Sequence, residues 1–343
     1  MPIIDQSHSM IGGYTNDLTK AIECDFPVII FGDHTKCVKL VSFPFAPGAD
    51  GIKVLQPKPG ILPKYLYYGT QYLTLRTESK GYARHYQYIQ KKDLAVPTDS
   101  EQKCIVSKIE ELFSRLDASV AELQTAKEKL KVYRQAVLKE AFAEFRIKKP
   151  IREVTSIVTS GSRGWAKYYS SHGAKFIRIG NLTSDSIKVD CTEMQYVTLP
   201  KNAEGTRTKL QTNDVLVSIT ANLGSIGLVP DAIGDAYINQ HIALVRFTNP
   251  NQSEFMAWYL RSDLGQKDLL KNKRGAGKLG LGLDDIRETK IPLVSDEQAV
   301  SVVSSINSRL SVCDSIEQTI DTSLQQAESL RQSILKQAFE GNL

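Results

Sequence analysis

The sequence lacks the features that mark membrane, secreted and metal-binding proteins. None of its apolar runs approaches the roughly 18 residues that a membrane-spanning helix needs, and the N-terminus has no charged start followed by an apolar stretch. Cysteine is scarce, and no two cysteines form a CxxC pair: Cys24, Cys37, Cys104, Cys191 and Cys313. An odd, dispersed set is typical of a reducing compartment and argues against a metal cluster. We therefore expect a cytoplasmic protein without a resident metal.

Catalytic motifs are also missing. The chain has no GxGxxG after a strand, no GxxxxGK[ST], no HExxH and no Asn/Asp-Pro-Pro-aromatic tetrad of the kind that adenine methyltransferases use on a flipped base. Asp284, Asp285 and Glu288 could form a carboxylate cluster for metal-assisted cleavage, but acidic residues at such a place more often start a helix or lie on the surface. The sequence thus predicts no catalytic residue and no cofactor in this chain.

One long segment does occur twice in the 343 residues. The first copy opens with PTDSEQ at Pro97, continues with apolar residues at 3- and 4-residue spacing, and closes with YRQAVLKEAF. The second opens with IPLVSDEQ at Ile291 and closes with LRQSILKQAF, at an offset of 195 to 197 residues. Spacing sustained over this length is typical of a coiled-coil seam, so we expect two helical rods, each roughly 67 Å long.

The two rods carry opposite net charge. Residues 101–149 hold 11 basic and 8 acidic side chains, whereas residues 296–343 hold 3 basic and 7 acidic ones. Opposite charges favour pairing of the two rods, and antiparallel packing would return each rod toward the other globular unit. The alternative is that each rod merely buries one stripe against its own globular neighbour.

The globular segments repeat as well, which predicts an α+β fold with two α/β units and a pseudo-twofold. FPVIIFGDH aligns with DVLVSITAN, and GADGIKVLQP aligns with NQHIALVRFTNP. We place the first unit at residues 1–96, the first rod at 97–149, the second unit at 150–295 and the second rod at 296–343. About forty residues of the first unit, including any counterpart of SGSRGW, are missing, so we expect Met1 to lie inside a domain.

Loops of the second unit have the composition of a nucleic-acid surface. They mix phosphate donors, a possible guanine reader, stacking rings and Asn or Gln groups suited to adenine, and glycines would let the backbone approach phosphates closely. The predicted DNA-binding residues of this unit are Ser162, Arg163, Trp165, Lys167, Tyr168, Thr220, Asn222, Asn239, Gln240, His241, Lys271, Lys273, Arg274 and Lys278. Their counterparts in the first unit are Asp33, His34, Thr35, Lys36, Lys80 and Arg84. The alternative is that these loops are simply solvated turns.

Apolar residues off the main seam of the rods predict a further contact surface. One helix pair buries only one stripe on each rod, so a second stripe calls for another partner. We predict that partner-binding surface at Phe113, Tyr133, Leu138, Phe142, Leu335 and Phe339.

Taken together, these motifs resemble the specificity subunit of type I restriction-modification systems, with a shortened first target recognition domain. The resemblance covers essentially the whole chain, through the EQ-opened rods with their RQAVLKEAF and RQSILKQAF endings and through GSRGW, FIRIGNL and AYINQHIALVRF. It implies that each globular unit reads one half of a split double-stranded DNA site and that the rods pack antiparallel and set the spacing.

The resemblance also implies partners and their cofactors. Two methyltransferase subunits would dock on the rods, and a restriction subunit that translocates DNA can join them. S-adenosylmethionine, ATP and Mg would be bound in those subunits and not in this chain. A different class stays open, since a coiled-coil adaptor whose globular heads bind protein would show the same rods.

Overall fold

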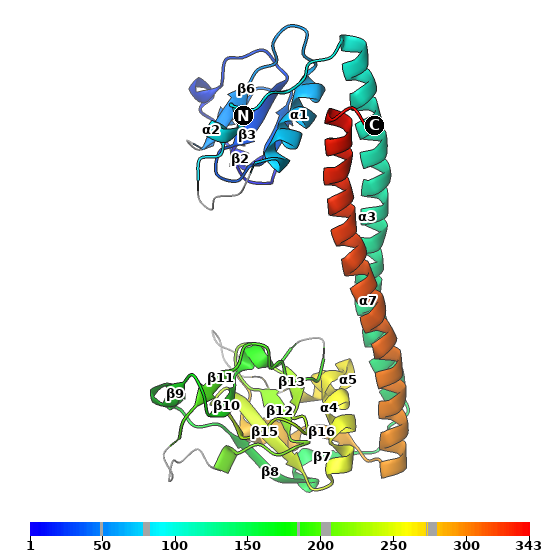
Figure 1. Cartoon of the computed structure of the whole chain (residues 1–343). Helices are drawn as coiled ribbons and strands as arrows, with labels where there is room; N and C mark the ends of the chain where they lie inside the picture. The colour runs from blue at the N-terminus through cyan, green and yellow to red at the C-terminus, as the bar shows by residue number, and fades with distance from the viewer. Residues whose placement is uncertain (49–50, 78–82, 184–185, 200–206, 272, 274–279) are drawn as a thin grey trace. The chain divides into compact units, whose positions relative to one another are not determined.

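The computed structural model describes residues 1–48, 51–77, 83–183, 186–199, 207–271, 273 and 280–343. The chain divides into two compact units, one formed by Met1–Lys127 with Gln318–Leu343 and the other by Glu128–Glu317. Each unit contains a globular head and a part of both long helices (Figure 1). Among the described residues, no helix is both long and apolar enough to cross a membrane.

The head of the first unit is built on two small sheets. The first has the order β2-β1-β5, with β1 at Pro2–Ile4, β2 at Gly13–Tyr14 and β5 at Ala46–Pro47. The second has the order β4-β3-β6, with β3 at Val28–Gly32, β4 at Val38–Val41 and β6 at Ile52–Leu55, all antiparallel. Every residue of β3 is buried, because its Val-Ile-Ile-Phe run faces apolar side chains on both sides. Helices α1 (Pro63–Leu75) and α2 (Tyr86–Ile89) complete this head.

The head of the second unit repeats this plan at greater length. One sheet has the order β13-β12-β15-β8, all antiparallel, and the other has the order β14-β10-β11-β9. Their bounds are β8 Thr155–Ser160, β9 Tyr169–Ser170, β10 Ala174–Ile177, β11 Gln195–Val197, β12 Val215–Ser218, β13 Ile226–Leu228, β14 Ala236–Ile238 and β15 Ile242–Phe247. A short pair, β7 (Lys148–Pro150) with β16 (Lys290–Pro292), closes the head.

Helices of this second head are α4 (Ser253–Arg261), α5 (Asp263–Leu269) and α6 (Leu283–Glu288). Single 3₁₀ turns occur in both heads, at Leu18–Lys20, Ile151–Glu153, Trp165–Tyr168, Ile179–Asn181 and Pro250–Gln252. The apolar face of α4 packs on the sheet of β12 and β15, and this contact forms the main core of the head.

Backbone hydrogen bonds show that the central part of the fold is repeated in the two heads. Asp33 N donates to Gly51 O in the first head, and Ile219 N donates to His241 O at the corresponding place in the second. His85 N then donates to Asp33 O, just as Leu281 N donates to Ile219 O. Asp33 therefore corresponds to Ile219, two residues before the position that the sequence alignment assigns to it.

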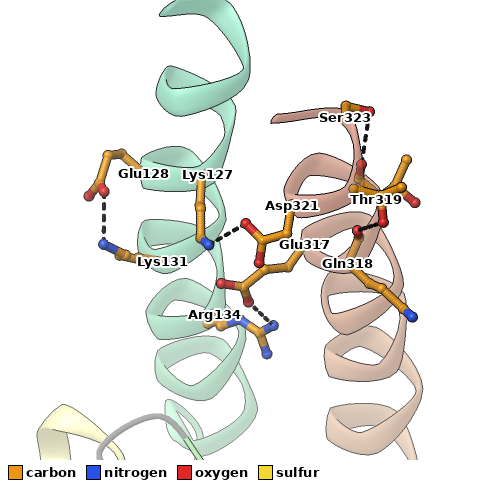
Figure 2. A network of polar contacts seen from close by, with 10 residues as sticks. Lys127, Glu128, Lys131, Arg134, Glu317, Gln318, Thr319, Asp321 and Ser323 are labelled. Atoms are coloured by element: carbon orange, nitrogen blue, oxygen red, sulfur yellow. Dashed lines mark hydrogen bonds and ion pairs between the residues drawn. The ribbon is translucent and has the colours of Figure 1, made fainter. Parts of the chain in front are cut away.

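The two long helices are present as predicted, at Asp99–Phe142 (α3) and Asp296–Phe339 (α7), 44 residues each. The first is shorter than the predicted rod, since Lys148–Pro150 is a strand. Within each unit the two helices run antiparallel, because residues later in α3 have partners earlier in α7: in the first unit Asp117 pairs with Arg331 and Lys127 with Asp321. In the second unit Arg134 pairs with Glu317 and Glu140 with Arg309. In the first unit Lys127 Nζ lies 2.6 Å from Asp321 Oδ1, and in the second Arg134 Nη2 lies 3.0 Å from Glu317 Oε2 (Figure 2). Arg134 Nη2 also lies 2.7 Å from Asp314 Oδ1.

The apolar residues off the helix seam are not an unoccupied stripe, which corrects the prediction for Phe113, Leu138, Phe142, Leu335 and Phe339. The first four are 1 to 7% exposed, and Phe339 is partly buried. Phe142 contacts the rings of Phe255 and Tyr259 on α4, and Phe339 contacts Tyr65 and Tyr72 on α1, all at centroid distances of 5.1 to 5.4 Å.

Each long helix therefore buries its second stripe against a globular head as well as pairing with the other helix. The two arrangements that the sequence presented as alternatives are both present. Of the six predicted contact residues, only Tyr133 keeps an exposed side chain, at 44%, and the guanidinium of Arg309 lies 5.5 Å from its ring.

Candidate nucleic-acid interface

In the second head, three loops leave the sheet at one edge. The last residue of β8, Ser160, pairs with Ala243, and the last residue of β12, Ser218, pairs with Ile242. The loops after Ser160 and Ser218 thus emerge beside the Asn239–His241 connection that enters β15. Antiparallel pairing brings these segments together, although Ser160 and Ala243 are 83 residues apart in sequence.

The end of the Gly-rich loop joins the same edge. Leu281 N donates to Ile219 O at 3.0 Å, and Thr220 forms an isolated bridge with Gly280. The predicted residues Lys271 and Lys273, on the other side of this loop, are exposed. Arg274 and Lys278 lie outside the described residues, so the structure does not place them.

Gly161 is required where the SGSRG loop crosses this edge. A Cβ at this position would lie 2.2 Å from Ile238 O and 2.4 Å from Asn239 O, so no larger residue fits without moving backbone. Arg163 follows with an exposed side chain, and Gly164 adopts a left-handed conformation with φ of 81°. The loop therefore holds Arg163 in solvent next to the Asn239–His241 connection.

A hydrogen-bonded group of side chains occupies the centre of the edge. His241 Nδ1 lies 2.8 Å from Thr220 Oγ1, and His241 Nε2 lies 2.8 Å from Gln240 Nε2. Because an amide nitrogen only donates, His241 Nε2 accepts in this arrangement and its Nδ1 carries the proton toward Thr220. Asn239 Oδ1 accepts from His241 N at 3.1 Å, and the side chain of Asn222 is exposed. The edge thus combines hydroxyl, amide and imidazole groups, which can pair with base edges.

The aromatic part of the prediction needs correction. Trp165 is 4% exposed and stacks on Phe176 with centroids 4.8 Å apart, so its ring belongs to a core and is not available to a base. Tyr168 is half-buried with its ring edge-on to Trp165. Lys167 Nζ lies 4.9 Å from the Tyr168 ring centroid. Ser162 is partly buried as well, and its Oγ has no hydrogen-bond partner among the described residues.

Sequence reasoning missed Arg207. Its Nη1 donates to Thr159 Oγ1 at 2.9 Å and its Nη2 to Ser160 O at 3.3 Å, which places an exposed cation at the end of β8. The segment around it, KNAEGTRTKL, has no apolar periodicity, and its basic residues were the only available signal.

The first head does not present the corresponding residues in the same way. Asp33 is 4% exposed and its Oδ1 accepts from Tyr86 N at 2.8 Å, while Thr35 Oγ1 donates to Gln6 O at 2.6 Å. Lys36 Nζ donates to Thr77 O at 2.8 Å, and His34 Nδ1 lies 3.2 Å from Ala83 O. These bonds hold the loop backbone, so Asp33 in particular has a structural role instead of the predicted contact.

Two further predicted residues of the first head differ in what the structure shows. Arg84 is exposed, whereas Lys80 lies outside the described residues. Neither a counterpart of β8 nor one of the SGSRG loop occurs among the described residues of this head.

The acidic residues near the end of the second head have structural partners. Asp285 Oδ2 accepts from Gly282 N at 2.8 Å and caps α6, and Asp284 pairs with Arg287. Glu288 forms an ion pair with Arg152. Among the described residues, no group of three or more His, Cys, Asp or Glu side chains is arranged to hold a metal ion.

Comparison with known proteins agrees with this fold. The family model for the type I restriction modification DNA specificity domain matches residues 145–326. The specificity subunit of the type I restriction enzyme EcoBI from Escherichia coli is 25% identical over 280 residues, and that of StySPI from Salmonella potsdam is 24% identical over 271. Both alignments cover 73% of this chain and 58% of the relative, so the chain spans less than two thirds of the length of these curated relatives.

Solved structures extend the similarity to the whole fold. A chain from a structure of complex assembly and conformational transition of the type I R-M system aligns with a TM-score of 0.76 at 17% identity, covering 100% of this chain and 92% of that one. The HsdS subunit from Thermoanaerobacter tengcongensis aligns with a TM-score of 0.56, also at 17% identity, covering 100% and 90%. With a family model that matches more than half of its residues, the chain belongs to the family of type I restriction-modification DNA specificity domains.

Proposed function

We propose that this chain is a DNA-binding specificity subunit that reads a bipartite site and carries no catalytic residues of its own. The observation that supports this proposal most is the convergence of four loops at one edge of the second head. There the Thr220, Gln240 and His241 side chains form a hydrogen-bonded group beside the exposed Arg163 and Arg207. Arginine contacts guanine and phosphate well, and Asn or Gln contacts adenine, so this edge has the donors and acceptors that base reading needs.

The proposed partners follow from the family. Two DNA-methylating subunits would dock on the helix pair and transfer a methyl group from S-adenosylmethionine to adenine. A restriction subunit that uses ATP and Mg would join them. The setting would be the cytoplasm, where the DNA and these subunits are found together.

Methylation-sensitive sequencing tests the proposal directly. A host that expresses this chain with its methylating subunits should acquire adenine methylation at one split sequence motif, and the motif should vanish when this chain is deleted. A host that expresses the chain with Gln240→Leu and Arg163→Ala should show a changed or lost half of the motif. Methylation that does not depend on this chain would contradict the proposal.

A further inference from the structure

The second unit contains a cavity between its head and its helix pair. It has a volume of about 800 Å³, and its wall combines Arg134, Leu310 and Asp314 of the helices with Trp258 of α4. Arg134 spans the two helices by bonding both Asp314 and Glu317. Burial alone would lower the pKa of Arg134, but the hydrogen bonds that it donates to these carboxylates outweigh burial and raise the pKa, which favours the charged form.

The first unit contains a smaller cavity of about 450 Å³ in the corresponding place. Its wall combines Phe113, Asp117 and Arg331 of the helices with Tyr68 of α1. Arg331 forms an ion pair with Asp117, and its guanidinium lies 4.4 Å from the Phe113 ring centroid. The Tyr68 ring packs edge-on against Phe113 at 5.8 Å.

These two cavities are copies of one site. The helix duplication has an offset of 197 residues, which converts Phe113 to Leu310, Asp117 to Asp314 and Arg134 to Arg331. A polar contact between the head and the long helix is repeated as well. Lys64 of α1 pairs with Glu110 at 2.6 Å, and Glu254 of α4 accepts a hydrogen bond from Asn307 at 2.8 Å. Loops that read different bases have no reason to duplicate a pocket, whereas two copies of one partner need two corresponding sites.

Each pocket offers a hydrogen-bond donor on an aromatic ring. Trp258 is 6% exposed, and its Nε1 has no hydrogen-bond partner among the described residues. A buried N–H without an acceptor costs about 1 to 3 kcal/mol, so the site favours a ligand that supplies one. In the first pocket burial raises the pKa of Tyr68 to about 12, and its hydroxyl therefore stays protonated and able to donate.

Each pocket also carries surplus negative charge. Four carboxylates and two cations line the second pocket, with Asp231 and Glu254 in addition to the residues that Arg134 bonds. Two carboxylates and one cation line the first. A site lined by hydrogen-bond donors and surplus carboxylates fits a segment with free carbonyl groups and basic side chains. The last turn of a helix has both, since its final carbonyls lack partners within the helix and Lys or Arg is favoured there.

We propose that the two pockets anchor the basic last turn of a helix from each of two copies of one partner protein. This inference rests on the proposed function, which makes that partner the DNA-methylating subunit. DNA itself does not fit, because surplus carboxylates repel phosphates. In the first pocket Lys64 already neutralises Glu110, so the second pocket, which is larger and more acidic, binds its copy more tightly.

The test titrates the full chain with the methylating subunit of the same system and measures stoichiometry by mass photometry. One variant alters the second pocket with Asp231→Asn, Glu254→Gln and Trp258→Phe. Another alters the first pocket with Tyr68→Phe and Glu110→Gln. The Asn, Gln and Tyr68→Phe substitutions nearly keep the size of the side chain, and Trp258→Phe keeps an aromatic ring. The control neutralises two exposed carboxylates outside both pockets and outside the long helices, Glu153→Gln and Glu193→Gln, and circular dichroism checks that every variant is folded.

The wild type and the control should bind two copies of the methylating subunit. Each single-pocket variant should bind one copy with wild-type affinity and the other at least tenfold more weakly. The two sites of the wild type should also differ in affinity, and the variant of the second pocket should lose the tighter one. Folded variants that bind two copies with unchanged affinity would overturn the pocket assignment while leaving the proposed function intact. If wild type binds no methylating subunit, the proposed partnership fails first and the inference falls with it.

Discussion

At the scale of single residues, we expect Arg163 and Lys273 to contribute differently to DNA binding. Both are exposed, but Arg163 follows the tight crossing at Gly161. Arg163→Ala should cost about 1 to 3 kcal/mol of binding free energy and relax specificity at one base pair, as expected for a lost guanine contact. Lys273→Ala should weaken binding equally for all sequences. Fluorescence anisotropy with the cognate duplex and a scrambled one measures both effects.

Lys290→Ala is a matched control for this pair, since Lys290 is exposed on β16, on a strand outside the loop edge. Its affinity should equal that of the wild type. Unchanged binding in both Arg163→Ala and Lys273→Ala at physiological salt would remove these two loops from the interface.

Phe142 connects α3 to the head of the second unit. Its side chain is 1% exposed and contacts the rings of Phe255 and Tyr259. Phe142→Ala should lower the free energy of unfolding by about 3 to 5 kcal/mol, because it removes buried apolar contacts and leaves a cavity. Urea denaturation followed by circular dichroism measures the change.

Val132→Ala on the same helix is the comparison, because Val132 is 71% exposed and should change stability by no more than about 0.5 kcal/mol. Leu138→Glu and Leu335→Glu should unfold the cores that contain them. If these charged variants keep the wild-type melting temperature, the buried positions of both leucines in the structure are wrong.

At the scale of elements, the start of α7 is held by one carboxylate. Asp296 accepts hydrogen bonds from Gln252 Nε2 and Asn249 Nδ2, both at 2.7 Å, and from Asn251 Nδ2 at 3.4 Å. These bonds lower the pKa of Asp296 in the folded protein, and the bond from Gln252 has the largest effect. Its ionised form therefore stabilises the fold at pH values above the usual aspartate pKa of about 3.9, and this contribution is lost as the pH falls below it.

Asp296→Asn should remove that acid-dependent part of the stability. Urea unfolding of wild type and variant between about pH 3 and pH 6 should show curves that approach each other at the acid end, since the wild-type side chain is protonated there. Glu193→Gln, an exposed carboxylate in a loop of the same head, is the control. A difference between wild type and Asp296→Asn that stays constant over this range would show that the charge of Asp296 does not stabilise α7.

At the scale of the whole molecule, salt dependence distinguishes a DNA-binding subunit from an adaptor with protein-binding heads. The chain carries a net charge of +5, its candidate edge contains the exposed Arg163 and Arg207, and Lys271 and Lys273 are exposed before the Gly-rich loop. Phosphate contacts release counterions, so the logarithm of the DNA-binding constant should fall linearly with the logarithm of the salt concentration, by about 0.9 per contact. Arg207→Ala should reduce this slope by about one contact. A flat salt response would favour the adaptor.

Periodicity and repetition in the sequence determined the architecture because both depend on local rules. The 3- and 4-residue spacing predicted both 44-residue helices, and α7 begins at Asp296 as predicted, since capping residues act within one turn. The β-branched runs predicted the central strands β3, β12 and β15. Short strands without such runs, among them β9 and β14, were not predicted.

Burial and hydrogen-bond partners were decided by the tertiary structure alone. A sequence shows that Phe142, Leu138 and Trp165 are apolar, but not which neighbour covers each of them, since that neighbour is 11 to over 100 residues away. Likewise, Asp33 and Thr220 both follow a strand, yet Asp33 is buried and bonds the backbone of Tyr86 while Thr220 stays at the open edge. The sequence therefore determined which segments repeat and form helices, and long-range packing decided which of their side chains remain exposed.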